Sequence, residues 1–210
     1  MKAEDFRLGA DVHAKDGQHV GALRSTLVDE GSLELKAIVV EESRAFSGQL
    51  LAPGAALITP NVLVPIEAVA DAKEERVDLT LGPTEIRRLP PYLTYRRLPP
   101  TLADALTLLG SLGGGNPPIS RLEVTAARPP GEIEIDQGKK VVLSDTGKRL
   151  GHVMDVLFED DELVGVVVEP EGLFKKPVLL PRRFLDRSDD EALHVHLTED
   201  DLRHLQPFSG

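Results

Sequence analysis

The Asp145-Thr146-Gly147 triplet is the stretch of this chain most readily associated with catalysis. Aspartic proteases carry this triplet on each of two loops, whose carboxylates share a proton. The chain repeats the stretch only as Lys15-Asp16-Gly17, which does not supply a second triplet. Asp-Gly and Thr-Gly pairs are also typical of hairpin turns, where glycine adopts a positive φ. We therefore predict turns at Gly17 and Gly147 and no proteolytic site.

His194 and His196 could hold a metal ion through two imidazoles on one strand face. The residues that alternate with them are Leu193, Val195 and Leu197. This alternation predicts an inward apolar set and two histidines that point to solvent, with adventitious nickel or zinc binding as the alternative. Residues 159–162, Glu-Asp-Asp-Glu, lack the Asp-x-Asp-x-Asp-Gly alternation of a calcium loop, so we predict a solvated turn there.

The glycine-rich stretch Gly113 to Gly115 resembles a phosphate-binding loop only in composition. Pro117 and Pro118 follow it and prevent the helix start with Lys-Ser or Lys-Thr that such a loop requires. The chain has no cysteine, which excludes disulfides, thiolate nucleophiles, cysteine-bound zinc and iron–sulfur clusters. We predict no catalytic residue, no metal and no cofactor, and expect that the chain is not an enzyme.

The charge of the chain disfavours nucleic acid as its main partner. It has 24 Lys or Arg against 35 Asp or Glu, a net charge of −11, whereas affinity for DNA or RNA rests on cationic side chains. Aromatic residues make up 4% of the chain, so few are present to stack on bases and any RNA contact is expected to be secondary. The six basic pairs are Arg87-Arg88, Arg96-Arg97, Lys139-Lys140, Lys148-Arg149, Lys175-Lys176 and Arg182-Arg183.

Two groups of residues are candidate partner-binding residues. They are Tyr92, Tyr95, Arg96 and Arg97 near the middle of the chain, and Lys175, Lys176, Arg182 and Arg183 further on. Tyrosine and arginine are enriched in interface hot spots, and clustered cations favour an acidic or ribonucleoprotein partner. Two alternatives stay open: the first group packs between two modules, and the second is ordinary surface charge.

An internal repeat organises the chain. Val12 to Gly21 returns as Val142 to Gly151, and Ala37 to Glu41 returns as Gly165 to Glu169. Later matches pair Leu63–Pro65 with Leu179–Pro181, Val77–Leu81 with Leu193–Leu197, and Ile86, Leu89, Pro91 and Tyr92 with Leu202, Leu205, Pro207 and Phe208. Because the order of these segments is preserved, we predict a duplicated module, each copy large enough for a small core of its own.

Each copy has the pattern of short strands. Val77 to Leu81 alternates apolar and polar residues, and the run Ala37 to Val40 is typical of a strand covered on both faces. Each copy is expected to close with a short helix, begun by Gly82-Pro83 in the first and by Thr198 with Asp201 in the second. The predicted fold is all-β, with two tandem small barrels. Its turn and core signature residues are Gly17, Gly21, Pro65, Gly147, Gly151 and Pro181.

The repeat predicts three segments: a first barrel at residues 1–92, a connector at 93–131 and a second barrel at 132–210. Proline and glycine pairs interrupt the connector, which is expected to contain a short helix at Leu102–Leu112 and a strand within residues 119–127. Each half is expected to fold by itself.

These residues resemble the PRC-barrel family, named for the cytoplasmic domain of the photosynthetic reaction centre H subunit. The family pattern stands here as Gly9-Ala10-Asp11-Val12, Asp16-Gly17-Gln18-His19-Val20-Gly21, Val64-Pro65-Ile66 and Leu89-Pro90. The second copy departs from it at Thr146, at Arg182 after Pro181, and at Leu205-Gln206. The resemblance implies two tandem, strongly bent barrels that bind other proteins without catalysis.

The function expected from this resemblance is a non-catalytic protein-binding adaptor, whose two diverged surfaces could engage one partner bivalently or two partners. One alternative is a ribosome-maturation-like factor that binds a ribosomal protein, and another is a peripheral subunit of a photosynthetic or electron-transfer membrane complex. The N-terminus lacks the basic and apolar pattern of a signal peptide, and Leu102–Leu112 is about half the length of a bilayer span. We therefore expect a cytoplasmic protein without membrane insertion, and leave its oligomeric state open.

Overall fold

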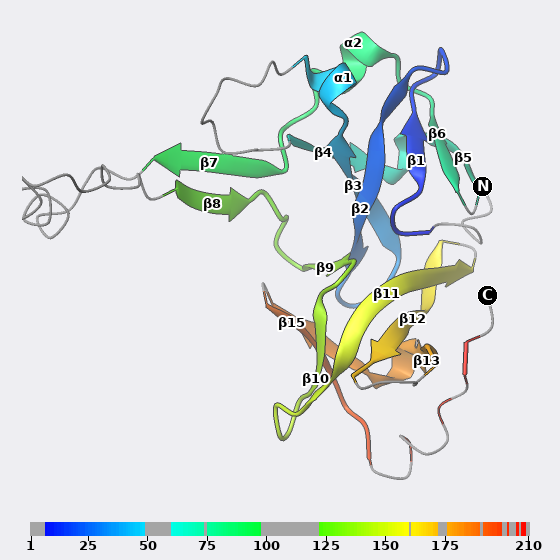
Figure 1. Cartoon of the computed structure of the whole chain (residues 1–210), viewed down its shortest axis with the longest axis vertical. Coiled ribbons are helices and arrows are strands. Elements are labelled where there is room, and N and C mark those ends of the chain that lie inside the picture. Colours follow the sequence, from blue (N-terminus) through cyan, green and yellow to red (C-terminus); the bar gives the residue numbers. More distant parts are fainter. Residues whose placement is uncertain are drawn as a thin grey trace, which may run out of the picture.

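The computed structural model describes residues 7–48, 60–73, 75–97, 122–159, 161–171, 176–189, 191–198, 201, 205 and 207–208, with only the backbone described at 94–97 and 122–124. Strands form nearly all of its regular structure, and they build two bodies stacked along the long axis of the molecule (Figure 1). The prediction of an all-β fold with two tandem barrel-like domains is confirmed.

The first body, called barrel 1 below, is a bent sheet with the strand order β4-β3-β2-β1-β6-β5. Its strands are β1 (Asp11–His13), β2 (His19–Asp29), β3 (Leu35–Glu42), β4 (Asn61–Pro65), β5 (Val69–Lys73) and β6 (Arg76–Leu79). A seventh strand, β9 (Glu132–Asp136), pairs with the second half of β2. All neighbours are antiparallel except β1 and β6, which run parallel.

The second body, called barrel 2 below, has the matching strand order β13-β12-β11-β10-β15-β14. Its strands are β10 (Lys140–Leu143), β11 (Arg149–Glu159), β12 (Glu162–Pro170), β13 (Val178–Pro181), β14 (Leu185–Ser188) and β15 (Ala192–Val195). The parallel pair recurs between β10 and β15. The duplicated strand order agrees with the predicted repeat.

The repeat alignment at the first hairpin is wrong by one residue. Val12 faces Gly21 across the β1–β2 ladder, but Gly151 faces Val141 and not Val142. The hairpin of barrel 2 is one residue longer, because six residues separate Val142 from its partner Arg149. Matching residue types between the two copies cannot show where a turn has gained a residue. The pairing of residues across the two strands does show it.

The run Ala37 to Val40 is buried on both faces of its sheet, as predicted. Ile38 and Val40 belong to the main core, while Ala37 and Val39 contribute to a second cluster on the other face together with Leu27 and Tyr92. These four residues of β3 are at most 6% exposed. An unbroken apolar, β-branched stretch is the sequence pattern of such a doubly covered strand.

Short helical turns occur in both barrels. In barrel 1 they are α1 (Arg44–Ser47), α2 (Pro83–Ile86) and η1 (Ile66–Ala68), and barrel 2 contains η2 (Arg182–Phe184). Of the short helical turns, α2 and the turn capped by Thr198 lie where the sequence predicted a closing helix, whereas α1, η1 and η2 were not predicted. Gly82 N donates to Glu85 Oε2 at 2.8 Å, at the expected start of α2. In the second copy Asp201 N donates to Thr198 Oγ1 at 3.1 Å, which confirms the predicted cap. The predicted helix at Leu102–Leu112 lies outside the described residues.

Main-chain hydrogen bonds join the two barrels. β9 lies by sequence in the segment predicted for the second barrel, yet it completes the sheet of barrel 1. Leu35 N donates to Asp161 O at 2.9 Å and Leu163 N donates to Leu33 O at 3.0 Å. A single cluster of buried apolar residues runs through both barrels. The division at residues 92 and 131 stays a prediction, and the core crosses it.

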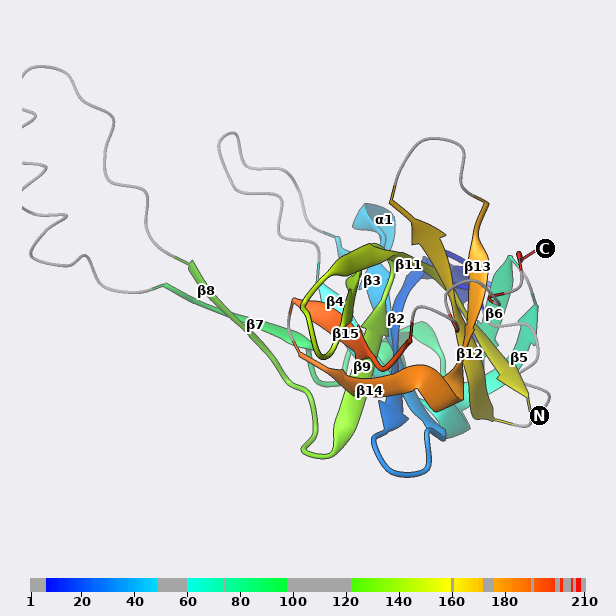
Figure 2. The same ribbon diagram turned by 90° about the horizontal axis from the view of Figure 1, so that it is seen from below.

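A two-stranded arm leaves barrel 1 beside β4 (Figure 1). It consists of β7 (Leu93–Arg97) and β8 (Leu122–Ala126), paired antiparallel. The second strand confirms the one predicted within residues 119–127. Ala127 N donates to Tyr92 O at 2.7 Å, which anchors the base of the arm, and both ribbon views show the arm extending away from the two barrels (Figures 1 and 2).

Candidate functional site

Tyr92 is a core residue of barrel 1 and not an available partner contact. Its side chain is 2% exposed and packs with Leu27, Ala37 and Val39 on the outer face of the sheet. Burial raises the pKa of its hydroxyl. The suggestion that Tyr92 binds a partner is therefore wrong for its side chain. It packs on barrel 1 beside the start of the arm, and these contacts do not lie between the two barrels as the alternative had it.

The other residues of the first candidate group are Tyr95, Arg96 and Arg97, and all three belong to β7 of the arm. Their backbone pairs with residues 122–124 of β8. The structure therefore separates them from Tyr92 and carries them away from both barrels (Figure 2). Their role in partner binding stays a prediction.

In the second candidate group, three residues are described and border hollows on barrel 2. Lys176 lines the larger hollow, whereas Arg182 and Arg183 of η2 line a smaller one. Arg182 Nη1 lies 2.6 Å from Glu162 Oε2, and the guanidinium of Arg183 lies 4.6 Å from the ring centroid of Phe184. Lys175 lies outside the described residues.

The larger hollow is a cavity of about 690 Å³ at one end of barrel 2. Its apolar walls come from β10, β12, β13 and the segments after β15, and include Val141, Val168, Val178, Leu180, Leu197 and Leu205. Three cations, Lys148, Arg149 and Lys176, stand at its edge. Arg149 Nε lies 2.6 Å from Glu171 Oε1. Among the described residues, no carboxylate forms an ion pair with Lys148 or Lys176. The site thus combines apolar walls with two uncompensated positive charges.

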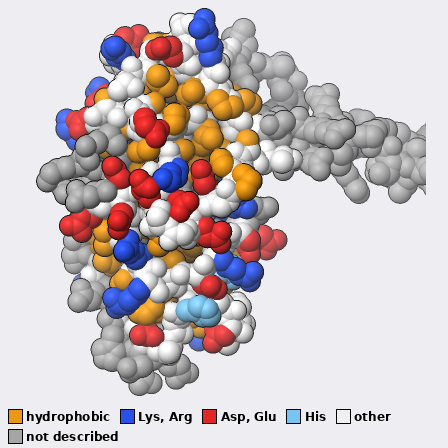
Figure 3. Space-filling model, turned by 180° about the vertical axis from the view of Figure 1, so that it is seen from behind, with side chains coloured by type: hydrophobic (Ala, Val, Ile, Leu, Met, Phe, Trp, Pro, Cys, Tyr) orange, Lys and Arg blue, Asp and Glu red, His pale blue; other side chains and the backbone are white. Residues whose placement is uncertain are grey.

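The space-filling view shows charged side chains of both signs on the lower body (Figure 3). On the lower body, which is barrel 2, Lys and Arg side chains stand next to hydrophobic ones (Figure 3). The upper body presents a broader hydrophobic area on this face (Figure 3). In the sequence Lys148-Arg149 is a basic pair without a site, because only folding brings the β10–β11 turn next to Lys176.

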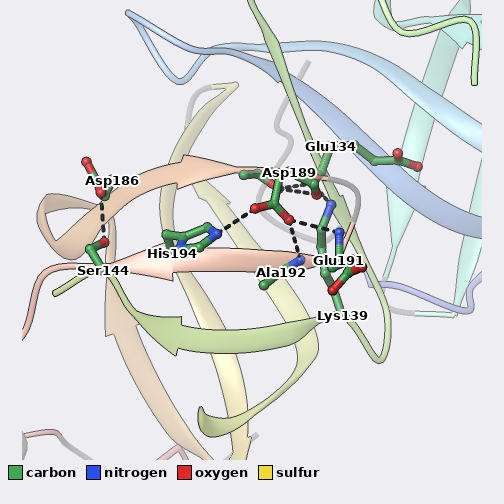
Figure 4. A network of polar contacts seen from close by, with 9 residues as sticks. Glu134, Lys139, Ser144, Asp186, Asp189, Glu191, Ala192 and His194 are labelled. Atoms are coloured by element: carbon green, nitrogen blue, oxygen red, sulfur yellow. Dashed lines mark hydrogen bonds and ion pairs between the residues drawn. The ribbon is translucent and has the colours of Figure 1, made fainter. Parts of the chain in front are cut away.

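His194 and His196 lie next to different carboxylates and do not converge on one point, and Figure 4 shows His194 directed at Asp189. His194 Nε2 lies 2.7 Å from Asp189 Oδ2, and His196 Nε2 lies 3.7 Å from Asp186 Oδ2. The His194 side chain is only 14% exposed, so the prediction that both histidines point to solvent is wrong for it. The hydrogen bond from His194 lowers the pKa of Asp189 to about 2. No group of three or more potential metal ligands occurs among the described residues.

The Asp145-Thr146-Gly147 triplet and the segment between β11 and β12 both form turns. Gly17 and Gly147 have φ values of 84° and 66°, as predicted for hairpin turns, and Thr146 N donates to Asp145 Oδ1 at 3.1 Å. The turn between β11 and β12 was predicted to be solvated. It also contacts barrel 1, because Asp161 O accepts a hydrogen bond from Leu35 N. Gly113 to Gly115 lie outside the described residues.

Two ionisable residues are buried, although the sequence identified Lys139 only as part of a basic pair and did not single out Asp155. Lys139 is 5% exposed, and its Nζ donates to Glu134 O at 3.0 Å and lies 3.6 Å from Asp136 Oδ2. Asp155 is 6% exposed, and its Oδ1 accepts from Leu8 N at 3.0 Å. The repeat read from the sequence matches Ala10 with Lys140, and only the hydrogen-bond pattern of the structure shows that Lys139 takes the place of the buried Ala10.

Comparison with known proteins supports the fold of the second half. Residues 137–202 match the PRC-barrel domain family. This range covers the strands β10 to β15 and excludes β9, which the structure assigns to barrel 1. No curated protein matches the chain. No helix among the described residues is long and apolar enough to span a bilayer.

Proposed function

We propose that this chain is a non-catalytic protein-binding module, and that the basic end of barrel 2 is its docking surface. The match of residues 137–202 to the PRC-barrel domain supports a binding role for this half. The cavity within that half carries the proposal: it has apolar walls, with Lys148 and Lys176 at its edge. Apolar pockets with a few placed polar groups are the usual form of binding sites.

The charge of the whole chain strengthens this choice of surface. A protein of net charge −11 repels acidic partners over most of its surface. Lys148 and Lys176, which have no ion-pair partner among the described residues, make the surface around the cavity locally positive. This positive charge would attract an acidic protein segment to the cavity. We further propose that the chain acts in the cytoplasm as an adaptor. It would bind one partner at the cavity of barrel 2 and a second partner at the arm.

Charge reversal tests the docking surface. We expect the full-length Lys148→Glu/Lys176→Glu protein to lose its partner in capture from a native extract. The matched control is Lys15→Glu/Lys140→Glu, which makes the same charge change at two other exposed lysines. Equal capture by the wild type and by both variants would contradict the proposed surface.

The identity of the captured partner separates the alternatives. Ribosomal or assembly proteins, retained after RNase treatment, would favour a ribosome-maturation-like factor. Components of a photosynthetic or electron-transfer complex would favour a peripheral subunit. Fractionation of cells into cytoplasm and membranes tests the proposed location in the same preparation.

A further inference from the structure

Equivalent residues of the two barrels contact each other reciprocally. Leu35 N of barrel 1 donates to Asp161 O, and Leu163 N of barrel 2 donates to Leu33 O. Leu33 and Asp161 are the two non-glycine residues with a positive φ among the described residues, at 58° and 66°. Each lies two residues before the donor leucine of its own barrel. In a two-fold arrangement, a contact between two residues implies the same contact between their equivalents, and the two barrels follow this rule.

The long strands β2 and β11 are equivalent over their whole length. Each has 11 residues. The pairing of each strand with the next one skips a residue at the same point, Arg24 in β2 and Met154 in β11. The second half of β2, residues 25–29, therefore corresponds to residues 155–159 of β11.

The chain enters each barrel in the same way. Gly9 N and Gly138 N each donate to the carbonyl oxygen of the residue just before the skipped one, at 2.7 Å and 2.8 Å. Both glycines have a positive φ, 93° and 84°, a conformation that residues with a side chain rarely adopt. Gly9 and Gly138 therefore hold the same place, and residues 3–7 correspond to residues 132–136.

Residues 132–136 form β9, which precedes the second copy of the repeat but pairs antiparallel with the second half of β2 in barrel 1. Ile135 of this strand is fully buried in the shared core. The residue that corresponds to Ile135 in the segment before Gly9 is Phe6, which is also apolar. The reciprocal contact would therefore place residues 3–7 along the second half of β11 in barrel 2.

The first described residues of the chain already lie at the second half of β11. The described structure begins at Arg7, with six residues before it. Arg7 Nε lies 3.9 Å from Asp155 Oδ2. Leu8 N and Val156 N both donate to Asp155 Oδ1, at 3.0 Å and 2.9 Å. The Asp155 carboxylate thus joins the main chain before β1 to the main chain of β11, at the point where the two segments would begin to run side by side.

We propose that residues 3–7 dock as an antiparallel strand on the edge of β11 that faces away from β12, with the Phe6 side chain packed into the core of barrel 2. Five residues of a strand span about 17 Å at about 3.4 Å per residue, so residues 3–7 match the length of residues 155–159. Each barrel then receives one strand from the segment that precedes the other copy. The two barrels cannot separate without breaking both pairings.

An engineered disulfide tests this strand in the full-length protein. The chain has no cysteine, so an introduced pair has no competing thiol. Asp5→Cys/Leu157→Cys places two cysteines opposite each other, at the positions that match Glu134 and Leu27, which face each other across β9 and β2. We expect this pair to oxidise about tenfold faster than the control Glu4→Cys/Leu157→Cys, because neighbouring residues of a strand point to opposite faces.

Mass spectrometry of the alkylated protein measures the oxidation rate, and non-reducing electrophoresis identifies the occupant. A disulfide within the monomer supports docking of the chain's own segment. A disulfide-linked dimer would assign the edge to the N-terminal segment of a second copy and overturn the proposal. No oxidation of the Asp5 pair, or equal rates for both pairs, would refute the strand.

Truncation of Phe6 tests its packing in barrel 2. We expect Phe6→Ala to lower the melting temperature by about 6 °C, because a buried aromatic side chain is lost. The control Asp5→Ala changes the other face of the same strand and should stay within about 2 °C of the wild type. Thermal melts followed by circular dichroism measure both variants. An unchanged melting temperature for Phe6→Ala is incompatible with the proposed packing.

Discussion

Asp155 is the residue at which the N-terminal segment of barrel 1 meets barrel 2. Its Oδ1 accepts from Leu8 N at 3.0 Å and from Val156 N at 2.9 Å, and Arg7 Nε lies 3.9 Å from its Oδ2. Burial nevertheless raises the pKa of Asp155, so loss of water outweighs these favourable contacts. The carboxylate is held mainly as a hydrogen-bond acceptor.

The raised pKa of Asp155 predicts its pH dependence. Because the folded state binds the proton more tightly than the unfolded state, this residue's contribution to stability falls as pH rises from 3.8 to the raised folded value. Asp155→Asn keeps the acceptor and removes the charge, so we expect equal or greater stability at pH 7 and no such pH dependence. Asp155→Ala should lose about 2 kcal/mol, because two buried amides lose their acceptor. Urea unfolding at pH 4 and pH 7 measures both, and a less stable Asn variant at pH 7 would refute this account.

Lys139 supports the turn between β9 and β10. It neutralises Asp136 and caps the carbonyl of Glu134, which also accepts from Ser188 Oγ at 3.1 Å. We expect Lys139→Met to cost about 2 kcal/mol, because it leaves a partly buried carboxylate without its cation. The Lys139→Met/Asp136→Asn protein should recover part of that loss. A double-mutant cycle by urea unfolding checks the coupling, and additive losses would exclude it.

At the scale of the elements, two kinds of glycine shape each barrel. Gly17 and Gly147 supply positive φ angles in turns with open space beside them. At Gly21 and Gly151 a Cβ would lie 1.9 Å and 2.0 Å from the carbonyl oxygens of Glu41 and Glu169. The long strands β2 and β11 can approach their neighbours there only because these residues lack a side chain.

Alanine substitutions distinguish the two kinds. Gly21→Ala and Gly151→Ala should each cost about 3 kcal/mol, because a strand backbone must move away from the added methyl group. Gly17→Ala and Gly147→Ala should each cost about 1 kcal/mol, the strain of a positive φ. Chemical denaturation of the four proteins measures the difference. Equal losses within each barrel would show that close strand approach is not the constraint.

At the scale of the whole molecule, the barrels form one folding unit. β9 supplies Ile133 and Ile135, which are 6% and 0% exposed, to the core that both barrels share. Residues 1–95 lack this strand and would expose the second half of β2 as an open sheet edge. The expectation that each half folds by itself therefore does not follow from this architecture.

We expect the full chain to unfold in a single calorimetric transition. Ile135→Ala should lower the stability of this transition by about 3 kcal/mol, the usual cost of truncating a buried isoleucine, without splitting it. Scanning calorimetry of both proteins measures this. Two separated transitions in the wild type, with only one shifted by the substitution, would show independent barrels.

Patterns of residues close in sequence determined the fold class and the local structure of this protein. Alternation, β-branched runs and turn glycines were sufficient for the all-β class and for the caps at Gly82 and Thr198, because each depends on neighbours close in sequence, and the repeated segments were sufficient for the duplicated module. Tertiary contacts alone decided that β9 joins barrel 1, that Tyr92 is buried and that Lys148 and Lys176 border one cavity. These outcomes depend on which distant segments pack together, and burial and charge compensation arise only from that packing.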